Sequence, residues 1–253
     1  MRILVTNDDG IHAPGLALLE QIAAQLSGDV YVVAPENDQS GVAHSLSLND
    51  PLRLRKVSER RFAVKGTPTD CVIMGVREIL ADHPPDVVLS GVNSGHNVAE
   101  DVIYSGTVAG AMEGAILGLP AIALSQSYGR RSKRDGILWG CARTHAAPLI
   151  EKILAEGVPP NVVVNVNFPD CPPEEVVGVA VTAQGRRDNM VRLDARRDGR
   201  GNPYYWIAFD RANSAPGRGV DLEAMAQDRI SVTPLRLDLT DGPTLTRYAQ
   251  ALA

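Results

Sequence analysis

The first ten residues, Met1-Arg-Ile-Leu-Val-Thr-Asn-Asp-Asp-Gly10, decide the predicted fold. Residues 3–5 form a short apolar run that stops abruptly at polar residues, which predicts a buried strand of a parallel sheet. Asp8 and Asp9 follow at the carboxyl end of that strand. Because open α/β sheets bind their ligands at the carboxyl ends of strands, we expect a functional site at this edge.

The pair Asp8 and Asp9 admits two interpretations. Two adjacent carboxylates repel each other, and burying them without partners costs free energy. A divalent cation removes both penalties: aspartate oxygens suit Mg²⁺ or Mn²⁺, and Gly10 permits a tight turn that brings both side chains to one ion. In the alternative interpretation, Asn-Asp-Asp-Gly is only a turn with a helix cap. The stretch by itself leaves both interpretations open.

The composition limits the classes of protein to consider. A chain of 253 residues with 44% hydrophobic and 22% charged residues is typical of one large globular domain, or of one domain with an appendage. A net charge of −5 gives no electrostatic case for binding nucleic acid or an anionic membrane, and no apolar segment is long enough to span one. We recognise no signal or transit peptide. Cys71, Cys141 and Cys171 are too scattered for a zinc site or a disulfide framework, which favours reduced thiols in a cytoplasmic protein.

Strands and helices alternate along the first half of the chain. Residues 16–26 carry an apolar helical face and residues 30–34 form a second apolar strand, so residues 1–34 predict a right-handed parallel βαβ unit. Further elements are expected in this order: a hairpin or extended excursion over 46–65, a helix from about 71 to 80 capped by Thr69 or Asp70, a buried strand at 86–90, a helix opened by Ser105, and a strand at 121–124.

The second half first continues this alternation of helices and strands and then becomes richer in strands and in polar, Arg-rich sequence. We expect a helix near 143–156, strands at 161–167, 176–182 and 204–209, a short helix at 221–227, a strand at 230–234 that returns to the main sheet, and a helical or frayed tail at 244–253. The Arg-rich stretch Arg186–Arg200 predicts an arm or long hairpin for subunit contact, although Arg186 and Arg187 could instead contact an anionic substrate. The predicted fold class is α/β, a Rossmann-like, mostly parallel sheet flanked by helices, with a C-terminal β-hairpin or arm for oligomerisation.

More oxygen-rich loops follow the other predicted strands. Ser40 offers a neutral hydroxyl ligand beside the two carboxylates, and Asn93 and Asn97 project amide groups. Residues 105–107 open a helix with free backbone N–H groups and two hydroxyls, which suits phosphate, although a simple N-cap explains them as well. The glycines after the third strand do not fit the spacing of a dinucleotide-binding fingerprint.

A collinear set of motifs then identifies a family. The motifs are Met1–Gly10, Ala34-Pro35, Ser40 with His44-Ser45, Gly66-Thr-Pro68 with Asp70-Cys71, Ser90-Gly-Val-Asn93 with Gly95 and Asn97, Ser105-Gly-Thr107, and Ser231-Val-Thr-Pro234. Together they resemble SurE, the survival protein E family of metal-dependent 5′/3′-nucleotidases, motif by motif over the first ~125 residues and more loosely, including Tyr204-Tyr-Trp206, to the end.

The resemblance carries a set of expectations. It implies one domain over 1–253, with the core sheet and active site in 1–170 and an extension, arm and returning strand in 171–253. It implies nucleoside monophosphates and often short-chain polyphosphate as substrates, with Mg²⁺ or Mn²⁺ as the cofactor. It also implies a cytoplasmic homodimer or homotetramer whose C-terminal parts are exchanged between subunits. The metal ligands that it implies are Asp8, Asp9, Ser40 and Asn93.

The expected reaction is hydrolysis of a phosphate monoester to nucleoside and phosphate. Ser105, Gly106 and Thr107 would hold phosphate oxygens and Asn97 would orient the phosphate, while Asp8 or Asp9 acts as the catalytic carboxylate. Whether that carboxylate positions a water or attacks phosphorus itself stays open. A haloacid dehalogenase-type phosphatase would place Asp-x-Asp after the first strand, unlike the adjacent pair here. A non-catalytic nucleotide- or phosphate-binding regulatory module is the alternative from another class, but it would gain nothing from two adjacent carboxylates without a cation.

Overall fold

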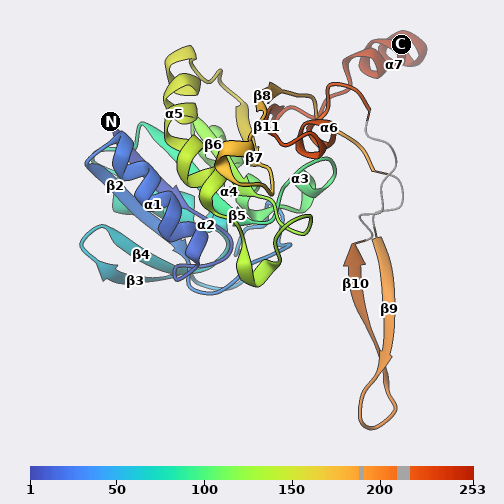
Figure 1. Cartoon of the computed structure of the whole chain (residues 1–253), viewed down its shortest axis with the longest axis horizontal. Helices are drawn as coiled ribbons and strands as arrows, with labels where there is room; N and C mark the ends of the chain where they lie inside the picture. Colours follow the sequence, from blue (N-terminus) through green and yellow to red (C-terminus); the bar gives the residue numbers. More distant parts are fainter. Residues whose placement is uncertain (188–190, 210–216) are drawn as a thin grey trace.

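The computed structural model describes residues 1–187, 191–209 and 217–253 (Figure 1). The strands are β1 Arg2–Thr6, β2 Asp29–Pro35, β3 Arg53–Ser58, β4 Arg61–Lys65, β5 Val87–Ser94, β6 Ala121–Gln126, β7 Val162–Phe168, β8 Gly178–Val181, β9 Val191–Arg197, β10 Pro203–Phe209 and β11 Arg229–Arg236. The α-helices are α1 Pro14–Leu26, α2 Pro68–Met74, α3 Asp101–Tyr104, α4 Gly106–Ile116, α5 Gly140–Glu156, α6 Asp221–Ala226 and α7 Gly242–Leu252. Three short helices of other types are the π-helix η1 Gly75–Ile79 and the 3₁₀ helices η2 Arg134–Gly136 and η3 Pro173–Glu175.

The main sheet has the order β3-β4-β2-β1-β5-β6-β7-β11-β8 within the described residues. All neighbours from β4 to β7 pair in parallel, while β3–β4 and β7–β11 are antiparallel. The strand order reverses at β1, which lies between β2 and β5. In a doubly wound sheet this reversal opens a crevice at the carboxyl ends of the strands. The predicted Rossmann-like, mostly parallel sheet is confirmed, and the crevice opens where Asp8 and Asp9 follow β1.

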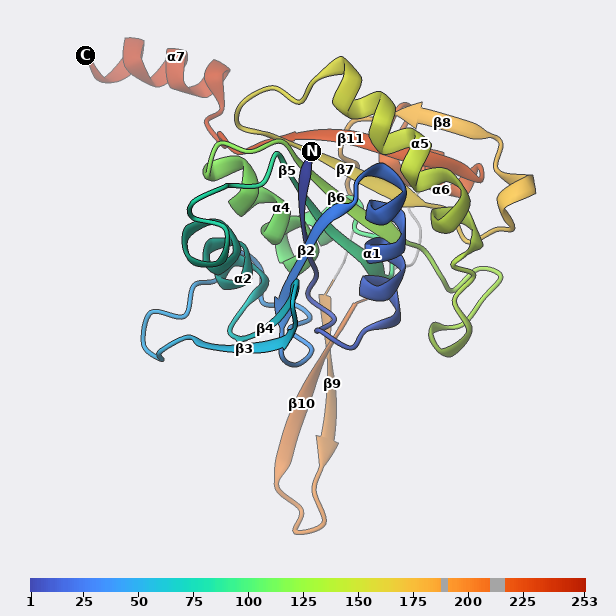
Figure 2. The same ribbon diagram turned by 90° about the vertical axis from the view of Figure 1, so that its left-hand side faces the viewer.

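Helices cover both faces of the sheet (Figure 2). Side chains of β1 alternate between the faces: Ile3 and Val5 join the apolar cluster under α1 and α5, whereas Leu4 joins the cluster under α2 and α4. All three are fully buried. Burying an aliphatic side chain of this size stabilises a fold by about 1.5–3 kcal/mol relative to exposing it. β1 therefore contributes side chains to the apolar clusters on both faces of the sheet, as its apolar run predicts.

The helix predicted from about residue 71 to residue 80 has different ends in the structure, where it is α2, Pro68–Met74. The N-cap of α2 is Thr67 and not Thr69 or Asp70: the Thr67 hydroxyl accepts a hydrogen bond from the Asp70 N–H at 3.2 Å, and the Asp70 carboxylate accepts one from the Thr67 N–H at 2.8 Å. This reciprocal capping box, followed by Pro68 in the first turn, sets the start of the helix. The α-helical turns end at Met74 and continue as η1. The hairpin expected over 46–65 is confined to β3 and β4.

The C-terminal segments behave largely as predicted. β11 returns to the main sheet between β7 and β8. β9 and β10 form an antiparallel hairpin that projects from the body, and α7 extends from the body elsewhere (Figures 1 and 2). The predicted arm is thus confirmed, with its residues 188–190 lying outside the described residues. The three cysteines are buried and free. In the described part of the chain, no helix is long and apolar enough to cross a membrane.

Candidate active site

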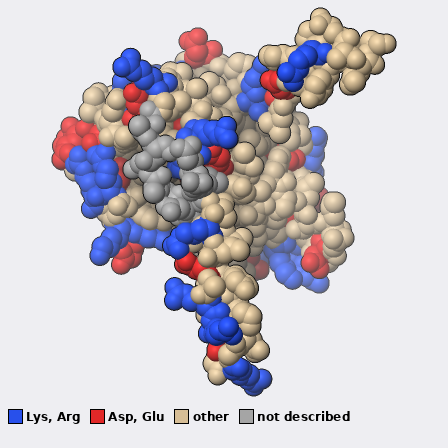
Figure 3. Space-filling model, turned by 90° about the vertical axis from the view of Figure 1, so that its right-hand side faces the viewer, with Lys and Arg blue, Asp and Glu red and all other residues tan. Residues whose placement is uncertain are grey.

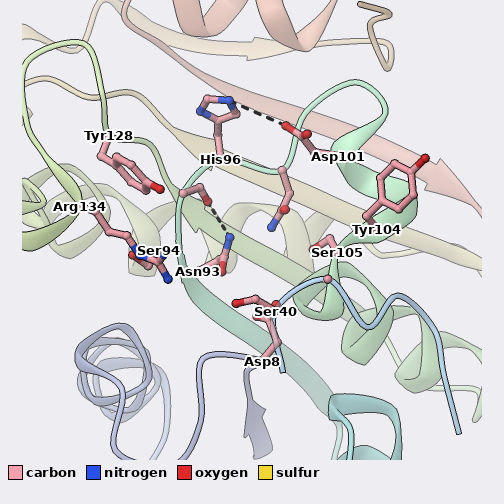
Figure 4. A pocket seen from close by; sticks show the side chains of 13 residues that line it. Asp8, Ser40, Asn93, Ser94, His96, Asp101, Tyr104, Ser105, Tyr128 and Arg134 are labelled. Carbon is pink, nitrogen blue, oxygen red and sulfur yellow. Dashed lines mark hydrogen bonds and ion pairs between the residues drawn. The ribbon is translucent and has the colours of Figure 1, made fainter. Parts of the chain in front are cut away.

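A pocket of about 170 Å³ opens at the carboxyl edge of the sheet (Figure 4). Its wall is formed by the carboxyl end of β5 and by the segments that follow four adjacent strands, β2, β1, β5 and β6, together with α3 and the start of α4. Its lining residues are Asp8, Ser40, Gly41, Asn93, Ser94, Gly95, His96, Asn97, Asp101, Tyr104, Ser105, Tyr128 and Arg134. The tertiary structure therefore brings residues from Asp8 to Arg134 into one cavity, among them five of the eight site residues expected from the sequence.

Asp8 lies at the floor of this pocket and is 5% exposed. Its Oδ1 accepts a hydrogen bond from the Thr107 hydroxyl on α4. Burial, and then the neighbouring charge of Asp9, raise the pKa of Asp8 to about 7, although the Thr107 hydrogen bond partly opposes them. An ionised Asp8 therefore needs more positive charge than the surrounding protein supplies.

Asp9 is half-buried beside Asp8 and is fixed by the backbone of β5. Its Oδ2 accepts a hydrogen bond from the Ser94 N–H at 3.1 Å. Burial raises the pKa of Asp9, the Ser94 hydrogen bond opposes the shift, and Asp38 and Arg134 act in opposite directions through their charges. Asp9 is absent from the lining of the cavity itself, but this hydrogen bond holds it next to Ser94, which is part of the lining.

One glycine lets the chain approach this carboxylate pair closely, and another lets β5 approach β6. A Cβ on Gly106 would lie 2.7 Å from the Cβ of Asp8, so glycine lets the first turn of α4 pack against the aspartate. Gly91 in β5 has φ +138°, and a Cβ there would lie 2.2 Å from the carbonyl oxygen of Leu124. The second glycine sets the path of the strand that delivers Asn93.

Ser40 and Asn93 supply neutral oxygens beside the carboxylates (Figure 4). The Ser40 hydroxyl and N–H both donate to Oδ1 of Asp38, at 2.6 and 2.8 Å, so Asp38 orients the serine. The Asn93 Nδ2 donates to the Gly95 carbonyl at 2.8 Å, which leaves the amide oxygen as the group that can bind a cation. Asp38 was visible in the sequence as a polar loop residue, but its contact with Ser40 follows only from the loop conformation.

The donor set fits a hard divalent cation. Asp8, Asp9, Ser40 and Asn93 offer only oxygen atoms, which Mg²⁺ and Mn²⁺ prefer. The raised pKa of the buried Asp8 marks a place where positive charge is missing. Among the described residues, no three His, Cys, Asp or Glu side chains are grouped so that they could hold a metal. A cation here would therefore depend on two carboxylates, neutral oxygens and water.

The expected phosphate-binding residues take different positions. Ser105 lines the pocket, and its hydroxyl caps α4 by accepting from the Val108 N–H at 3.0 Å. Thr107 is fully buried and directs its hydroxyl to Asp8. Gly106 packs against the same aspartate. This helix start thus contributes the Ser105 side chain to the pocket, while Thr107 holds Asp8 in place.

Asn97 is held by a network that the sequence did not reveal. Its N–H donates to Asn167 Oδ1 at 2.7 Å, its Nδ2 donates to Ser125 Oγ at 2.9 Å, and its carbonyl accepts from Asn165 and Asn167. The one indication of this network in the sequence is the pair Asn165 and Asn167 in the otherwise apolar strand β7. Buried amides on a strand need partners, so they mark contact with a polar loop.

Sequence reasoning also missed other residues of the lining, including His96, Asp101, Tyr128 and Arg134. Arg134 belongs to the basic stretch at 129–134 and is exposed, yet it borders the cavity. Arg187, one of the two arginines considered for substrate contact, lies behind the pocket and pairs with Asp101 at 3.0 Å. Its side chain is 7% exposed, so it supports the wall of the pocket instead of facing substrate.

Comparisons with known proteins agree with this fold. The family model for "Survival protein SurE" matches residues 3–190. A protein from Methylocella silvestris named 5′-nucleotidase SurE is 79% identical over 252 residues, covering 100% of both chains, and one of the same name from Methylobacterium radiotolerans is 70% identical over 254 residues at the same coverage. The crystal structure of the SurE protein from Aquifex aeolicus superposes with a TM-score of 0.86 at 40% identity, covering 100% of both chains.

Proposed function

This chain belongs to the survival protein SurE family and is a nucleotidase, and we propose that it hydrolyses nucleoside 5′- and 3′-monophosphates, and short-chain polyphosphate, with a divalent cation. The observation that carries the proposal is the pair Asp8 and Asp9 at the end of β1, packed against the start of α4. A carboxylate pair next to a helix N-terminus combines a place for a cation with a place for phosphate.

We assign Asp8, Asp9, Ser40 and Asn93 as the residues that hold Mg²⁺ or Mn²⁺. The cation would polarise a phosphoryl oxygen and lower the pKa of a bound water. Thr107 fixes the orientation of Asp8 by donating to its Oδ1, and the Ser94 N–H fixes Asp9. Preorganised carboxylates of this kind need little rearrangement when substrate arrives.

The remaining assignments concern the phosphate. The Ser105 side chain and the N–H groups at the start of α4 contact phosphate oxygens, where negative charge develops in the transition state. Asn97 orients the phosphate, held by its contacts to β7. Asp8 or Asp9 positions the attacking water. Trapping of a phosphorylated aspartate would show instead that a carboxylate attacks phosphorus directly.

The first test of the proposal is phosphate release from 5′-AMP, 3′-AMP, a short polyphosphate and p-nitrophenyl phosphate, each with Mn²⁺, Mg²⁺ or EDTA. We expect release that favours the nucleotides, depends on added metal and falls to background in EDTA, because the pocket relies on a cation to bring phosphate to two carboxylates. Binding of AMP that EDTA does not weaken, with no phosphate release, would favour the non-catalytic binding module.

We also propose that the protein is a homodimer or homotetramer joined through the hairpin and α7. On the hairpin, Leu193, Trp206 and Ile207 are each more than half exposed, and Figure 3 shows basic side chains along the same projection. On α7, Leu245 and Leu252 are 60% and 83% exposed. Apolar side chains gathered on projecting elements are typical of subunit contacts. Light scattering of the full chain is expected to give the mass of two or four subunits, and a monomer at micromolar concentration would contradict the proposal.

The cysteines bear on the cellular location. All three are buried and free, and they are scattered along the sequence without a disulfide framework. Free thiols of this kind suit a reducing compartment. We therefore propose a cytoplasmic enzyme.

A further inference from the structure

The loop between β6 and α5 carries four basic residues, Arg130, Arg131, Lys133 and Arg134, and it borders the pocket. Its start is anchored by Asp170, whose carboxylate accepts hydrogen bonds from the backbone N–H groups of residues 130, 131 and 132 at 2.6–3.0 Å. Asp170 is 4% exposed. A buried carboxylate with three backbone partners fixes the loop firmly, so the position of its basic side chains is a feature of the fold.

Two of these basic side chains are already paired. Arg130 binds Asp228 and donates to the carbonyl of Ala226, and Arg131 binds Asp228 and Glu175. Both arginines therefore fasten the loop to the turn between α6 and β11, and Arg131 also fastens it to η3. In the described part of the chain, neither Lys133 nor Arg134 forms an ion pair, and of the four only Arg134 lines the pocket.

Arg134 approaches the pocket from the side opposite Asp101 and Tyr104. Figure 4 shows its side chain extending toward Ser94 and Asn93. Ser94 donates to Asp9 at 3.1 Å, and the charge of Arg134 acts on that same carboxylate. The guanidinium is thus within electrostatic reach of Asp9, and the described residues show no salt bridge between the two.

The charge of the site leaves a role for this cation. Asp8, Asp9 and Asp38 carry three negative charges when ionised, and one divalent cation offsets two of them. A phosphate monoester adds about two further negative charges near neutral pH. Phosphate bound beside these carboxylates therefore remains strongly repelled unless the protein provides another positive group. A guanidinium also offers two parallel N–H donors that match two phosphoryl oxygens.

We propose that Arg134 is a catalytic residue that contacts the phosphoryl group of the substrate from the side of the pocket formed by the β6–α5 loop. The proposal rests on the proposed phosphatase function and adds a residue that the resemblance to the family does not supply. The guanidinium holds two non-bridging oxygens while Ser105 and the start of α4 hold the other side of the phosphate. Its contribution grows as charge accumulates on those oxygens in the transition state.

The test compares Arg134→Ala with Lys133→Ala, a matched control that removes the same charge from the adjacent position. For Arg134→Ala we expect kcat/KM for 5′-AMP to fall about 100-fold, with kcat itself reduced. Arg134→Lys should recover only part of this loss, because an ammonium keeps the charge but not the paired donors. Lys133→Ala should stay within about 2-fold of the wild type, since screening by solvent weakens a charge outside the pocket. Added guanidinium should partly restore Arg134→Ala.

Phosphate affinity and melting temperature distinguish a contact with substrate from a purely structural role. Phosphate affinity also tests Arg134 independently of the proposed function. Calorimetric titration of inorganic phosphate into the Mn²⁺-loaded proteins should show about 10-fold weaker binding by Arg134→Ala alone, with unchanged melting temperatures. If wild type releases no phosphate from any monoester, the proposed function is wrong, and phosphate binding still decides the role of Arg134. Unchanged phosphate affinity and unchanged kcat in Arg134→Ala, or no phosphate binding by wild type, would overturn the inference.

Discussion

Asp8→Asn and Asp9→Asn are each expected to lower the kcat for 5′-AMP by about 1000-fold or more with the fold intact. Each change removes a negative charge that the cation requires, yet preserves the size of the side chain. In the Asp8→Asn variant, the amide oxygen of the new side chain can still accept the hydrogen bond from the Thr107 hydroxyl. Steady-state kinetics with Mn²⁺, accompanied by circular dichroism, checks the result. Asp50→Asn, at an exposed position, is the matched control.

Asp8→Asn has a second expected effect that helps to distinguish a site residue from a structural one. The pKa of Asp8 is about 7 in the folded protein, against 3.8 for an ordinary aspartate. The folded state therefore binds one more proton than the unfolded state between about pH 4 and pH 7, and the metal-free protein loses stability as pH rises through that window, by on the order of 4 kcal/mol. Below about pH 4 the carboxyl is protonated in both states, so this source of pH dependence disappears.

Asparagine cannot ionise, so the metal-free Asp8→Asn variant should be more stable than the metal-free wild type at about pH 8 and similar to it near pH 4. Saturating Mn²⁺ should raise the melting temperature of the wild type much more than that of the variant. Thermal melts at both pH values, with and without EDTA, measure this directly. Full turnover in either variant, or equal stabilisation of both proteins by Mn²⁺, would refute the assignment of this carboxylate pair to a cation.

Arg187→Met is expected to destabilise the protein by about 3 kcal/mol. The Arg187 and Asp101 side chains are 7% and 9% exposed and lie 3.0 Å apart. The same guanidinium donates to the Val98 carbonyl at 3.2 Å and lies 3.3 Å from His96 Nε2. Methionine fills similar space but removes the guanidinium from the Asp101 carboxylate, which has little access to solvent, and weakening the pairing of a buried charge is costly.

Urea unfolding of the full chain checks this prediction. Arg186→Met is the matched control, because Arg186 is the exposed neighbour of Arg187, and its replacement should change the free energy of unfolding by less than about 0.5 kcal/mol. Because Arg187 holds the segment from His96 to Asp101, we also expect a higher KM for 5′-AMP in the Arg187 variant. Equal stability of the two variants would mean that the ion pair does not support the pocket wall.

Much of the fold could be predicted because its causes are local. The apolar run of residues 3–5 predicts β1, the apolar face of residues 16–26 predicts α1, and the returning strand at 230–234 is found within β11. The cap of α2 was predicted at the wrong residue. A capping box has a reciprocal contact between Thr67 and Asp70, and the proline between them fits the first turn of a helix that begins at Thr67.

The candidate site was predicted less completely, because its walls come from distant segments. Asp8 and Ser40 follow strands that could be recognised one by one, and Asn93 lies at the end of another, β5, which runs beyond the predicted 86–90 to Ser94. The parallel order of those strands brings the three residues together. Arg134 and Tyr128 belong to a loop whose course depends on Asp170, about 40 residues further along the chain. Arg134 borders the cavity, whereas Arg130 and Arg131 do not line it. The sequence around these three arginines does not indicate this difference.

The sequence by itself determined the class of the fold, the edge of the sheet where the site lies, and the carboxylate pair at its centre. These features depend on short-range patterns: side-chain alternation in strands, helical periodicity, and the polar residues that end each strand. Only the tertiary structure decided that the Thr107 hydroxyl serves Asp8, that Asn165 and Asn167 hold Asn97, and that Arg187 pairs with Asp101. Each of those contacts joins residues at least 68 positions apart, so they meet only when the chain packs. Burial makes such contacts strong, and burial is a property of the assembled sheet and helices rather than of any one segment.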